Sequence, residues 1–272
     1  MSIEGRLSEI WIYPIKSCQG ISLPSVELTE LGPAHDRRYM LVAEDGSFVS
    51  QRTHPRLARV GVELLDDAGS LRLRGPAMDE LVFPASVTEA RRDTRIFGDS
   101  ISALVASEAA STWFSTFFGE PMTLVASRDA GSTQSVPRTR DKRTGFADGF
   151  PWLAIGQASL DGLNARLTHP VSMRNFRPNL VFEGIQAHAE DRLGRLRIGD
   201  ATFEGLKPCG RCSIPNVDPD TGERGGLEPT KTLTTYRRDG NSVNFGQNMV
   251  HHDGRRITVG DPVRWLESRA PD

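Results

Sequence analysis

Short runs of β-branched and aromatic residues recur through the first third of the chain, separated by residues that favour turns. The first run, Leu7–Lys16, contains Pro14, which ends or bends a strand. Glu44-Asp45-Gly46 has the composition of a hairpin turn. Strands are predicted over Leu7–Lys16, Val26–Glu30, Arg38–Ala43, Ser47–Ser50, Arg59–Leu65, Leu71–Arg74, Glu80–Phe83 and Ser86–Glu89. Many short strands at such intervals are typical of a sheet, sandwich or barrel.

The apolar period becomes helical over Ser107–Phe118. One face of that helix carries Ala110, Trp113, Phe114 and Phe117. Ser107 suits the N-cap and Gly119 suits the C-terminal stop. Met122–Ala126 then returns to a strand pattern.

The second half of the chain mixes short strands with short helices. Strands are predicted over Pro151–Gly156, Asn179–Phe182, Leu196–Ile198, Ala201–Glu204, Ile257–Val259 and Pro262–Trp265. Helices are predicted over Ser159–Leu167 and Leu227–Arg238, with Pro229 in the first turn of the latter. Between the halves, Ser127–Gly145 is polar, basic and nearly free of large apolar residues, so it is either a solvated surface loop or a lid over an active site.

Composition restricts the class of protein. The 272 residues suffice for one large or two small domains, and the net charge of -2 argues against a general nucleic-acid or polybasic membrane binder. No apolar run is long enough for a transmembrane helix, and the first residues lack the pattern of a secretory signal. With only three cysteines, a disulfide scaffold is not expected, and we expect a reducing, cytoplasmic setting.

Cys209-Gly-Arg-Cys212 is the most informative local motif. A zinc site would need about four ligands, and no second cysteine pair exists. A redox dithiol would need the pair at the start of a helix, which the pattern after Cys212 does not predict. The pair could instead be two small buried residues, or Cys212 or Cys209 could be a single thiolate ligand of a soft metal. Spacing alone does not choose between the last two.

Cations stand at several turn-like positions. They are Lys16, followed by Ser17, then Arg37, Arg177 and Arg211. If they converge in space they would form an anion pocket, because guanidinium groups match phosphate oxygens. Taken singly, each is more simply an ordinary solvated charge. No nucleotide-binding glycine motif and no serine-hydrolase elbow occurs in the chain.

A series of motifs resembles the MOSC family, named for the C-terminal domain of molybdenum-cofactor sulfurase, and in particular the amidoxime-reducing components. In order, they are Trp11–Cys18 with Gly20, Asp36–Tyr39, Gln51-Arg52, Phe146–Pro151, Ser159-Leu160 with Leu163-Asn164, Asn175–Asn179, Cys209–Cys212, Val217–Gly222, Phe245–Gln247 and Val259–Val263. The resemblance covers nearly the whole chain. It implies a β-rich α+β fold, with an N-terminal MOSC β domain over residues 1–122 and a MOSC β-barrel domain over residues 123–268.

The resemblance also implies a cofactor, the molybdenum cofactor (Mo-molybdopterin). By position, Cys212 resembles the protein ligand of molybdenum, and Cys209 a neighbour that is not a ligand. Lys16, Ser17, Arg37 and Arg177 resemble positions that hold the pterin and its phosphate. Asp148, Asn179 and Arg211 match nearby motif positions and are expected in the same site.

The related reductases transfer two electrons to an N-hydroxylated small molecule, whose N–O bond breaks with release of water. We therefore expect an oxidoreductase of N-hydroxylated or related N- and S-oxide compounds, the alternative being a carrier of the cofactor or its sulfur. Three cysteines cannot ligate a plant-type iron–sulfur cluster, so electrons are expected from a separate donor protein of cytochrome b5-like, flavin or ferredoxin type. No membrane anchor and no nucleic-acid partner are expected.

Overall fold

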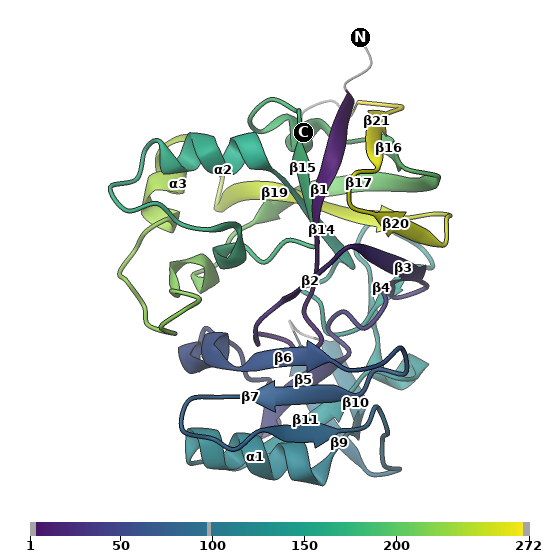
Figure 1. Cartoon of the computed structure of the whole chain (residues 1–272), viewed down its shortest axis with the longest axis vertical. Helices are drawn as coiled ribbons and strands as arrows, with labels where there is room; N and C mark the ends of the chain where they lie inside the picture. Colours follow the sequence, from purple (N-terminus) through teal and green to yellow (C-terminus); the bar gives the residue numbers. More distant parts are fainter. Residues whose placement is uncertain (1–3, 97–98, 269–272) are drawn as a thin grey trace.

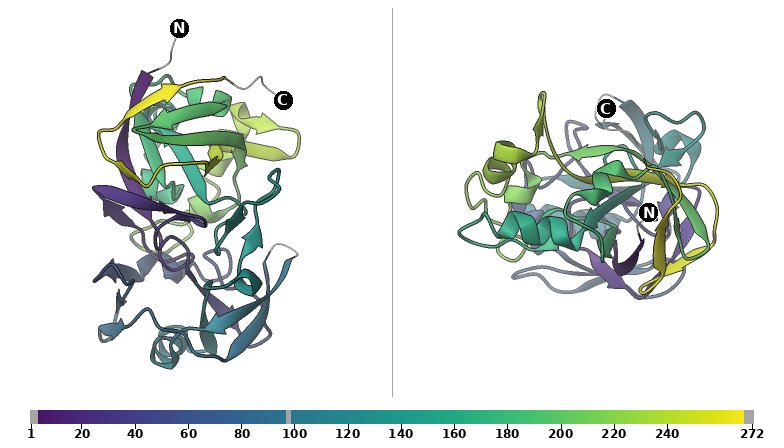
Figure 2. Two further views of the ribbon diagram at one scale, coloured as in Figure 1. Left: turned by 90° about the vertical axis from the view of Figure 1, so that its right-hand side faces the viewer. Right: turned by 90° about the horizontal axis from the view of Figure 1, so that it is seen from above.

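Two β-rich lobes lie one above the other along the long axis of the computed structural model, which describes residues 4–96 and 99–268 (Figure 1). The lower lobe contains β5 to β11 and α1, and the upper lobe contains the strands that follow residue 151. The first strand, β1 (Glu4–Ile12), belongs to the upper lobe. The turned views in Figure 2 show the same division.

The upper lobe is a closed barrel of seven strands. Around the barrel they are β14 (Trp152–Gly156), β15 (Leu180–Glu183), β1, β21 (Pro262–Trp265), β16 (Arg195–Ile198), β17 (Ala201–Gly210) and β19 (Ser242–His251). Pairing of β19 with β14 closes the ring, and only the β14–β15 pair is parallel among these neighbours. The predicted β-rich α+β fold with a barrel is therefore confirmed.

The N-terminal strand is part of the barrel made by the second half of the chain. In β1, Ile10 pairs with Leu180 of β15, and Gly5 pairs with Val263 of β21. Around it lie β2 (Ile21–Leu23), β3 (Ser25–Thr29), β4 (Gly32–Pro33) and β20 (Arg256–Thr258), and β20 pairs with β3. The chain thus contributes one strand to the barrel before it builds the lower lobe.

The lower lobe packs two small sheets and one helix around an apolar core. One sheet has the order β5 (Tyr39–Ala43), β11 (Met122–Ala126), β10 (Asp99–Val105) and β9 (Arg91–Ile96). The other contains β6 (Gly61–Leu64), β7 (Leu71–Arg74) and β8 (Leu81–Phe83). Helix α1 (Glu108–Phe118) buries its aromatic face against this core. Among the described residues no helix is long and apolar enough to cross a membrane.

The ends of α1 are those that the sequence predicts. The Ser107 hydroxyl accepts a hydrogen bond from the amide of Ala110 at 3.1 Å, which satisfies one of the free amides of the first turn. Gly119 ends the helix in the left-handed region, at φ 76°. Local chemistry therefore defines both ends of this helix.

The two remaining α-helices cover the outside of the barrel. They are α2 (Gln157–Asn164) and α3 (Thr230–Tyr236), and Leu163 and Leu233 from them join one apolar cluster with Phe176 and Phe245. Both are shorter than the predicted Ser159–Leu167 and Leu227–Arg238. Five short 3-10 helices also occur in the described chain: η1 (Pro55–Arg59), η2 (Ala130–Ser132), η3 (Met173–Asn175), η4 (Ala189–Arg192) and η5 (Ile214–Asn216).

Several strand predictions are wrong in detail. The first strand ends at Ile12 rather than Lys16, and Ser47–Ser50 and Ser86–Glu89 form no strand. The hairpin β9–β10 was not predicted, because β9 has only two buried positions, Thr94 and Ile96, among charged ones. β19 was also missed, since its asparagines and glutamine have low strand propensity and only its two barrel neighbours make it a strand.

The polar segment Ser127–Gly145 is folded against the protein. It contains η2 and a short hairpin of β12 (Gln134–Ser135) and β13 (Arg143–Thr144). The Gln134 side chain is buried and donates to the carbonyl oxygens of Gly145 and Ala147 at 2.6 and 3.0 Å. Arg138 at its tip lines the cavity described below, so the segment forms part of a cavity wall.

Candidate functional site

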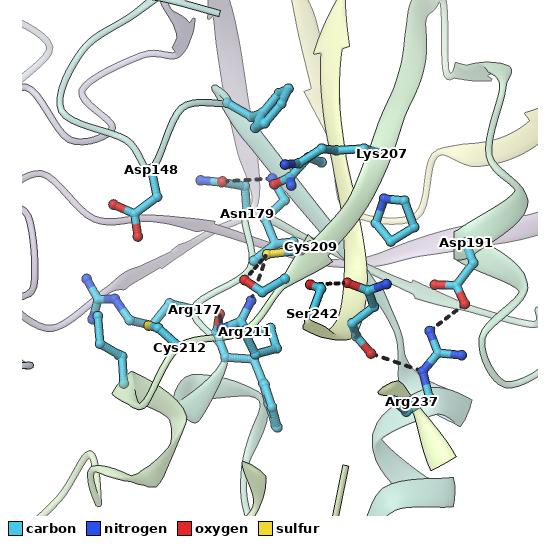
Figure 3. A pocket seen from close by; sticks show the side chains of 18 of the residues that line it. Asp148, Arg177, Asn179, Asp191, Lys207, Cys209, Arg211, Cys212, Arg237 and Ser242 are labelled. Atoms are coloured by element: carbon cyan, nitrogen blue, oxygen red, sulfur yellow. Dashed lines mark hydrogen bonds and ion pairs between the residues drawn. The ribbon is translucent and has the colours of Figure 1, made fainter. Parts of the chain in front are cut away.

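A cavity of about 910 Å³ is lined by the loop after β1, by the segments before and after β5, and by residues of the barrel strands β17 and β19. All of the site residues predicted from the sequence line it: Lys16, Ser17, Arg37, Asp148, Arg177, Asn179, Arg211 and Cys212. Figure 3 shows Asp191 and Arg237 across the cavity from Asp148, Arg177 and Cys212. Cations that are scattered through the sequence therefore do converge in space.

Lys16 lies just after β1 and is only 6% exposed. Its ammonium donates to the carbonyl oxygen of Phe146 at 2.8 Å and forms an ion pair with Asp148. Burial lowers the pKa of Lys16, and the attraction of Asp148 opposes that change. The loop that carries Asp148 is thereby tied to the first strand of the barrel.

Arg37 is held on three sides. Its guanidinium pairs with the buried Asp36 carboxylate at 2.7 Å, and donates to Asn179 Oδ1 at 3.0 Å and to the Arg177 carbonyl at 3.1 Å. Asp36 in turn accepts from the amide of Tyr13 at 2.8 Å. These contacts give the guanidinium one orientation before any ligand arrives.

The ring of Tyr13 contacts two guanidinium groups. Arg37 and Arg177 lie 4.4 and 4.2 Å from its ring centroid, and its hydroxyl donates to the Pro178 carbonyl at 3.1 Å. Arg177 also donates to the Cys18 carbonyl at 2.7 Å. Burial lowers the pKa of Arg177 to about 10, so it still carries its charge at neutral pH. The aromatic ring stabilises two like charges that would otherwise repel each other.

The backbone at this end of the cavity has an unusual conformation. Ser17, Arg37 and Arg177 all have positive φ, at 72°, 44° and 56°. For residues other than glycine this costs of order 1–3 kcal/mol each, and such residues cluster at ligand sites. We name Lys16, Arg37 and Arg177 the cation cluster.

Asn179 supports the cation cluster from behind. Its side-chain oxygen accepts from Arg37 and from the Leu153 amide at 3.2 Å, and its side-chain nitrogen donates to the Trp11 carbonyl at 3.1 Å. The residue is 1% exposed. Its amide is therefore occupied in joining β1 to β14, while Arg37 faces the cavity.

The cysteine motif begins in the last two residues of β17 and precedes η5. Cys209 is at the end of that strand, and its sulfur accepts a hydrogen bond from the Arg211 guanidinium at 3.2 Å. Arg211 also donates to the Phe176 carbonyl at 2.8 Å, while its buried Nε has no partner among the described residues. Cys212 is half-buried, lines the cavity, and makes no hydrogen bond through its sulfur within the described chain.

These facts bear on the four interpretations of the motif. Within residues 4–96 and 99–268, no group of three or more His, Cys, Asp or Glu side chains comes together, whereas a protein zinc site needs that number. Only the short turn η5 follows Cys212, so no α-helix N-terminus faces either thiol. Neither cysteine of the pair is fully buried. Cys18, in contrast, is fully buried, and burial raises its pKa to about 12.

The structure adds residues that sequence reasoning missed. Tyr13 and Asp36 lie behind the cation cluster, and both stand inside motifs that the sequence analysis quoted. On the barrel side, Arg237 pairs with Asp191 at 2.5 Å, and Lys207 lines the cavity from β17. No local pattern singles out these barrel residues, because η4, β17 and α3 come together only when the barrel closes.

Comparison with known proteins gives the family context. Residues 4–121 match the model of the MOSC N-terminal beta barrel domain, and residues 141–264 match that of the MOSC domain. The chain is 36% identical to the mitochondrial amidoxime reducing component 2 of Bos taurus, over 86% of this chain and 72% of that protein.

Two further relatives match almost the whole chain. The mitochondrial amidoxime-reducing component 1 of Homo sapiens is 34% identical, over 96% of this chain and 83% of that protein. The molybdenum cofactor sulfurase of Oryza sativa is 31% identical, over 96% of this chain and 34% of the much longer sulfurase.

Proposed function

The chain belongs to the MOSC family, and on that premise we propose that it binds the molybdenum cofactor, with Cys212 as the thiolate ligand, and reduces N-hydroxylated or related N- and S-oxide compounds. The observation that supports this most is the convergence of Cys212 with the cation cluster on one cavity. A soft thiolate beside fixed cations suits a ligand that combines a thiophilic metal with an anionic group.

The charges at this end of the cavity fit such a ligand. Lys16, Arg37, Arg177 and Arg211 carry four positive charges, and the carboxylates paired with them, Asp36 and Asp148, carry two negative ones. Two positive charges remain, and a phosphomonoester carries about −1.5 to −2 at pH 7. The unpartnered Arg211 Nε supplies one further donor that an anion would satisfy.

Each residue then has a defined task. Arg37 and Arg177 would bind the phosphate, oriented by Tyr13 and Asn179, and Lys16 would hold Asp148 beside it. Cys212 would bind the metal, and Cys209 would remain hydrogen-bonded to Arg211. When bound, the cofactor would supply the two electrons that, with two protons, convert an N–OH group to N–H and water. We propose that a separate protein delivers these electrons, and that the enzyme acts in the cytoplasm.

The content of molybdenum and pterin in the purified protein tests the proposal. Protein from a host that makes the cofactor should contain near-stoichiometric amounts of both. Cys212→Ala should lose the molybdenum, while the matched variant Cys209→Ala should keep most of it. Equal loss in both variants, or no metal and no pterin in the wild type, would contradict the one-ligand model.

A second role is supported by the sulfurase relative. Because the Oryza sativa protein is a molybdenum cofactor sulfurase, a carrier that binds the cofactor or its sulfur without turnover is the alternative. Reduction of benzamidoxime by the loaded protein with a chemical reductant separates the two roles. A loaded protein that reduces neither amidoximes nor N- and S-oxides would favour the carrier.

A further inference from the structure

The cavity carries far more positive than negative charge. Among the described residues that line it, ten are cations and three are carboxylates. The cations are Lys16, Arg37, Arg52, Arg138, Arg177, Arg192, Lys207, Arg211, Arg237 and Arg238, and the carboxylates are Asp148, Asp191 and Asp239. The whole chain has a net charge of -2, so the excess is local. A concave surface of one sign concentrates ligands of the other sign.

The proposed cofactor accounts for only part of this excess. Its phosphate would neutralise the charge left on the cation cluster and Arg211. On the barrel side, Arg237 is already paired with Asp191. Lys207 and Arg192 make no ion pair with any described carboxylate, although both line the cavity. We name Lys207, Arg192 and the pair Asp191–Arg237 the barrel wall.

Lys207 is positioned by β17 itself. It precedes Cys209 by two residues on that strand, and both side chains line the cavity. Its ammonium lies 5.7 Å from the ring centroid of Phe150, which is buried. The ring can guide the lysine stem without neutralising its charge.

A third donor comes from β21. Trp265 on β21 pairs with Leu196 on β16, shortly after Arg192 in the chain. Its side chain is more than nine-tenths buried, at 7% exposure, and lines the same cavity. The indole N–H has no partner among the described residues. A buried donor without an acceptor indicates that a ligand or water supplies one.

We propose that the barrel wall selects substrates that carry an anionic group, such as a carboxylate or a phosphate, distinct from the N–O group that is reduced. Lys207 and Arg192 bind this group by charge, and the Trp265 indole donates to it. This inference rests on the proposed reductase function and assigns its substrate class. The N–O bond is cleaved as stated above, and the anionic group takes no part in the chemistry.

Two matched substrates test the inference. Benzamidoxime carries no charged group on its ring, and 4-carboxybenzamidoxime carries one carboxylate there. With a small chemical reductant in place of a donor protein, we expect kcat/KM to be about tenfold higher for the carboxylate substrate at low salt. The double variant Lys207→Gln/Arg192→Gln should reduce that preference to about one, with little change for benzamidoxime. Arg256→Gln, which removes an exposed cation on β20, should leave the preference intact.

Binding gives a second readout that needs no turnover. Calorimetry should show tighter binding of 4-amidinobenzoate than of benzamidine, with the difference shrinking at high salt and in the double variant. Any of three outcomes would overturn the inference. They are equal kcat/KM of the wild type for both substrates, equal losses of kcat/KM toward both substrates in the double variant, and a defect of the double variant that occurs only in assays with a protein donor. If the loaded wild type reduces neither substrate, the proposed function is instead overturned.

Discussion

Arg37 and Arg177 in the cation cluster are each fixed by hydrogen bonds and by the ring of Tyr13, whereas Lys207 and Arg192 in the barrel wall are free of ion pairs with any described carboxylate. The first two also have left-handed backbone, which the surrounding contacts must stabilise. The cluster is therefore organised in advance, as a site for a tightly held ligand requires. Lys207 and Arg192 can adjust, as exchange of successive substrates requires.

The largest effect should come from removing a cation of the cation cluster. Arg37→Met leaves the Asp36 carboxylate, whose side chain is 2% exposed, without its cation. Removing one partner of a buried pair costs about 3–5 kcal/mol, so the free energy of unfolding in a denaturant titration should fall by that amount. Arg256→Met removes an exposed pair with Glu27 and should cost about 1 kcal/mol or less. Similar small losses in both variants would show that the cluster is not fixed by its contacts.

A smaller effect should follow from removing the ring between the arginines. Tyr13→Leu loses two cation–π contacts, each worth up to about 2 kcal/mol when desolvated, and leaves the repulsion between the two neighbouring guanidinium groups uncompensated. Binding of inorganic phosphate to the cofactor-free protein should weaken at least about tenfold. Tyr13→Phe keeps the ring and loses only the bond to the Pro178 carbonyl, so it should bind phosphate nearly as the wild type does. Equal weakening in both variants would assign the effect to the hydroxyl.

The smallest effect concerns His188, beside the barrel wall. Burial lowers its pKa to about 4, and the nearby Arg237 and Arg166 add to the shift. Since the folded pKa lies below the usual 6.5, the unfolded chain binds the proton first as the pH falls. The stability that depends on neutral His188 is therefore complete above pH 6.5 and is lost as the pH falls toward 4.

An NMR titration of the histidines and denaturation at several pH values check this. His188→Asn suits the left-handed backbone at this position, at φ 62°, and should flatten the fall in stability below pH 6.5. Arg237→Gln should raise the pKa of His188. The exposed His169→Asn serves as the control. A His188 pKa near 6.5 would show that the barrel wall is as open to solvent as the molecular surface.

Where local chemistry is sufficient, sequence and structure agree closely. Helix α1 begins after Ser107 and ends at Gly119, and β7 has the predicted bounds Leu71–Arg74. Motifs marked the positions of the predicted site residues, and the structure brings these residues to one cavity. The contacts through which Tyr13, Asp36 and Asn179 hold the cation cluster in place were not predicted from the sequence. A hydrogen bond between residues far apart in sequence leaves no local pattern.

The sequence by itself determined the β-rich α+β class, the capped helix and the residue types that we propose for binding an anion and a soft metal. Periodicity, capping and residue chemistry act over a few positions, so they can be recognised without a structure. Only the tertiary structure decided that β1 joins the barrel of the second half, that the polar β19 is a strand, and that Lys207 and Arg192 face the same cavity as Cys212. These outcomes depend on closing the ring between strands far apart in the chain, where each strand gains its hydrogen bonds and its inward face only from its neighbours.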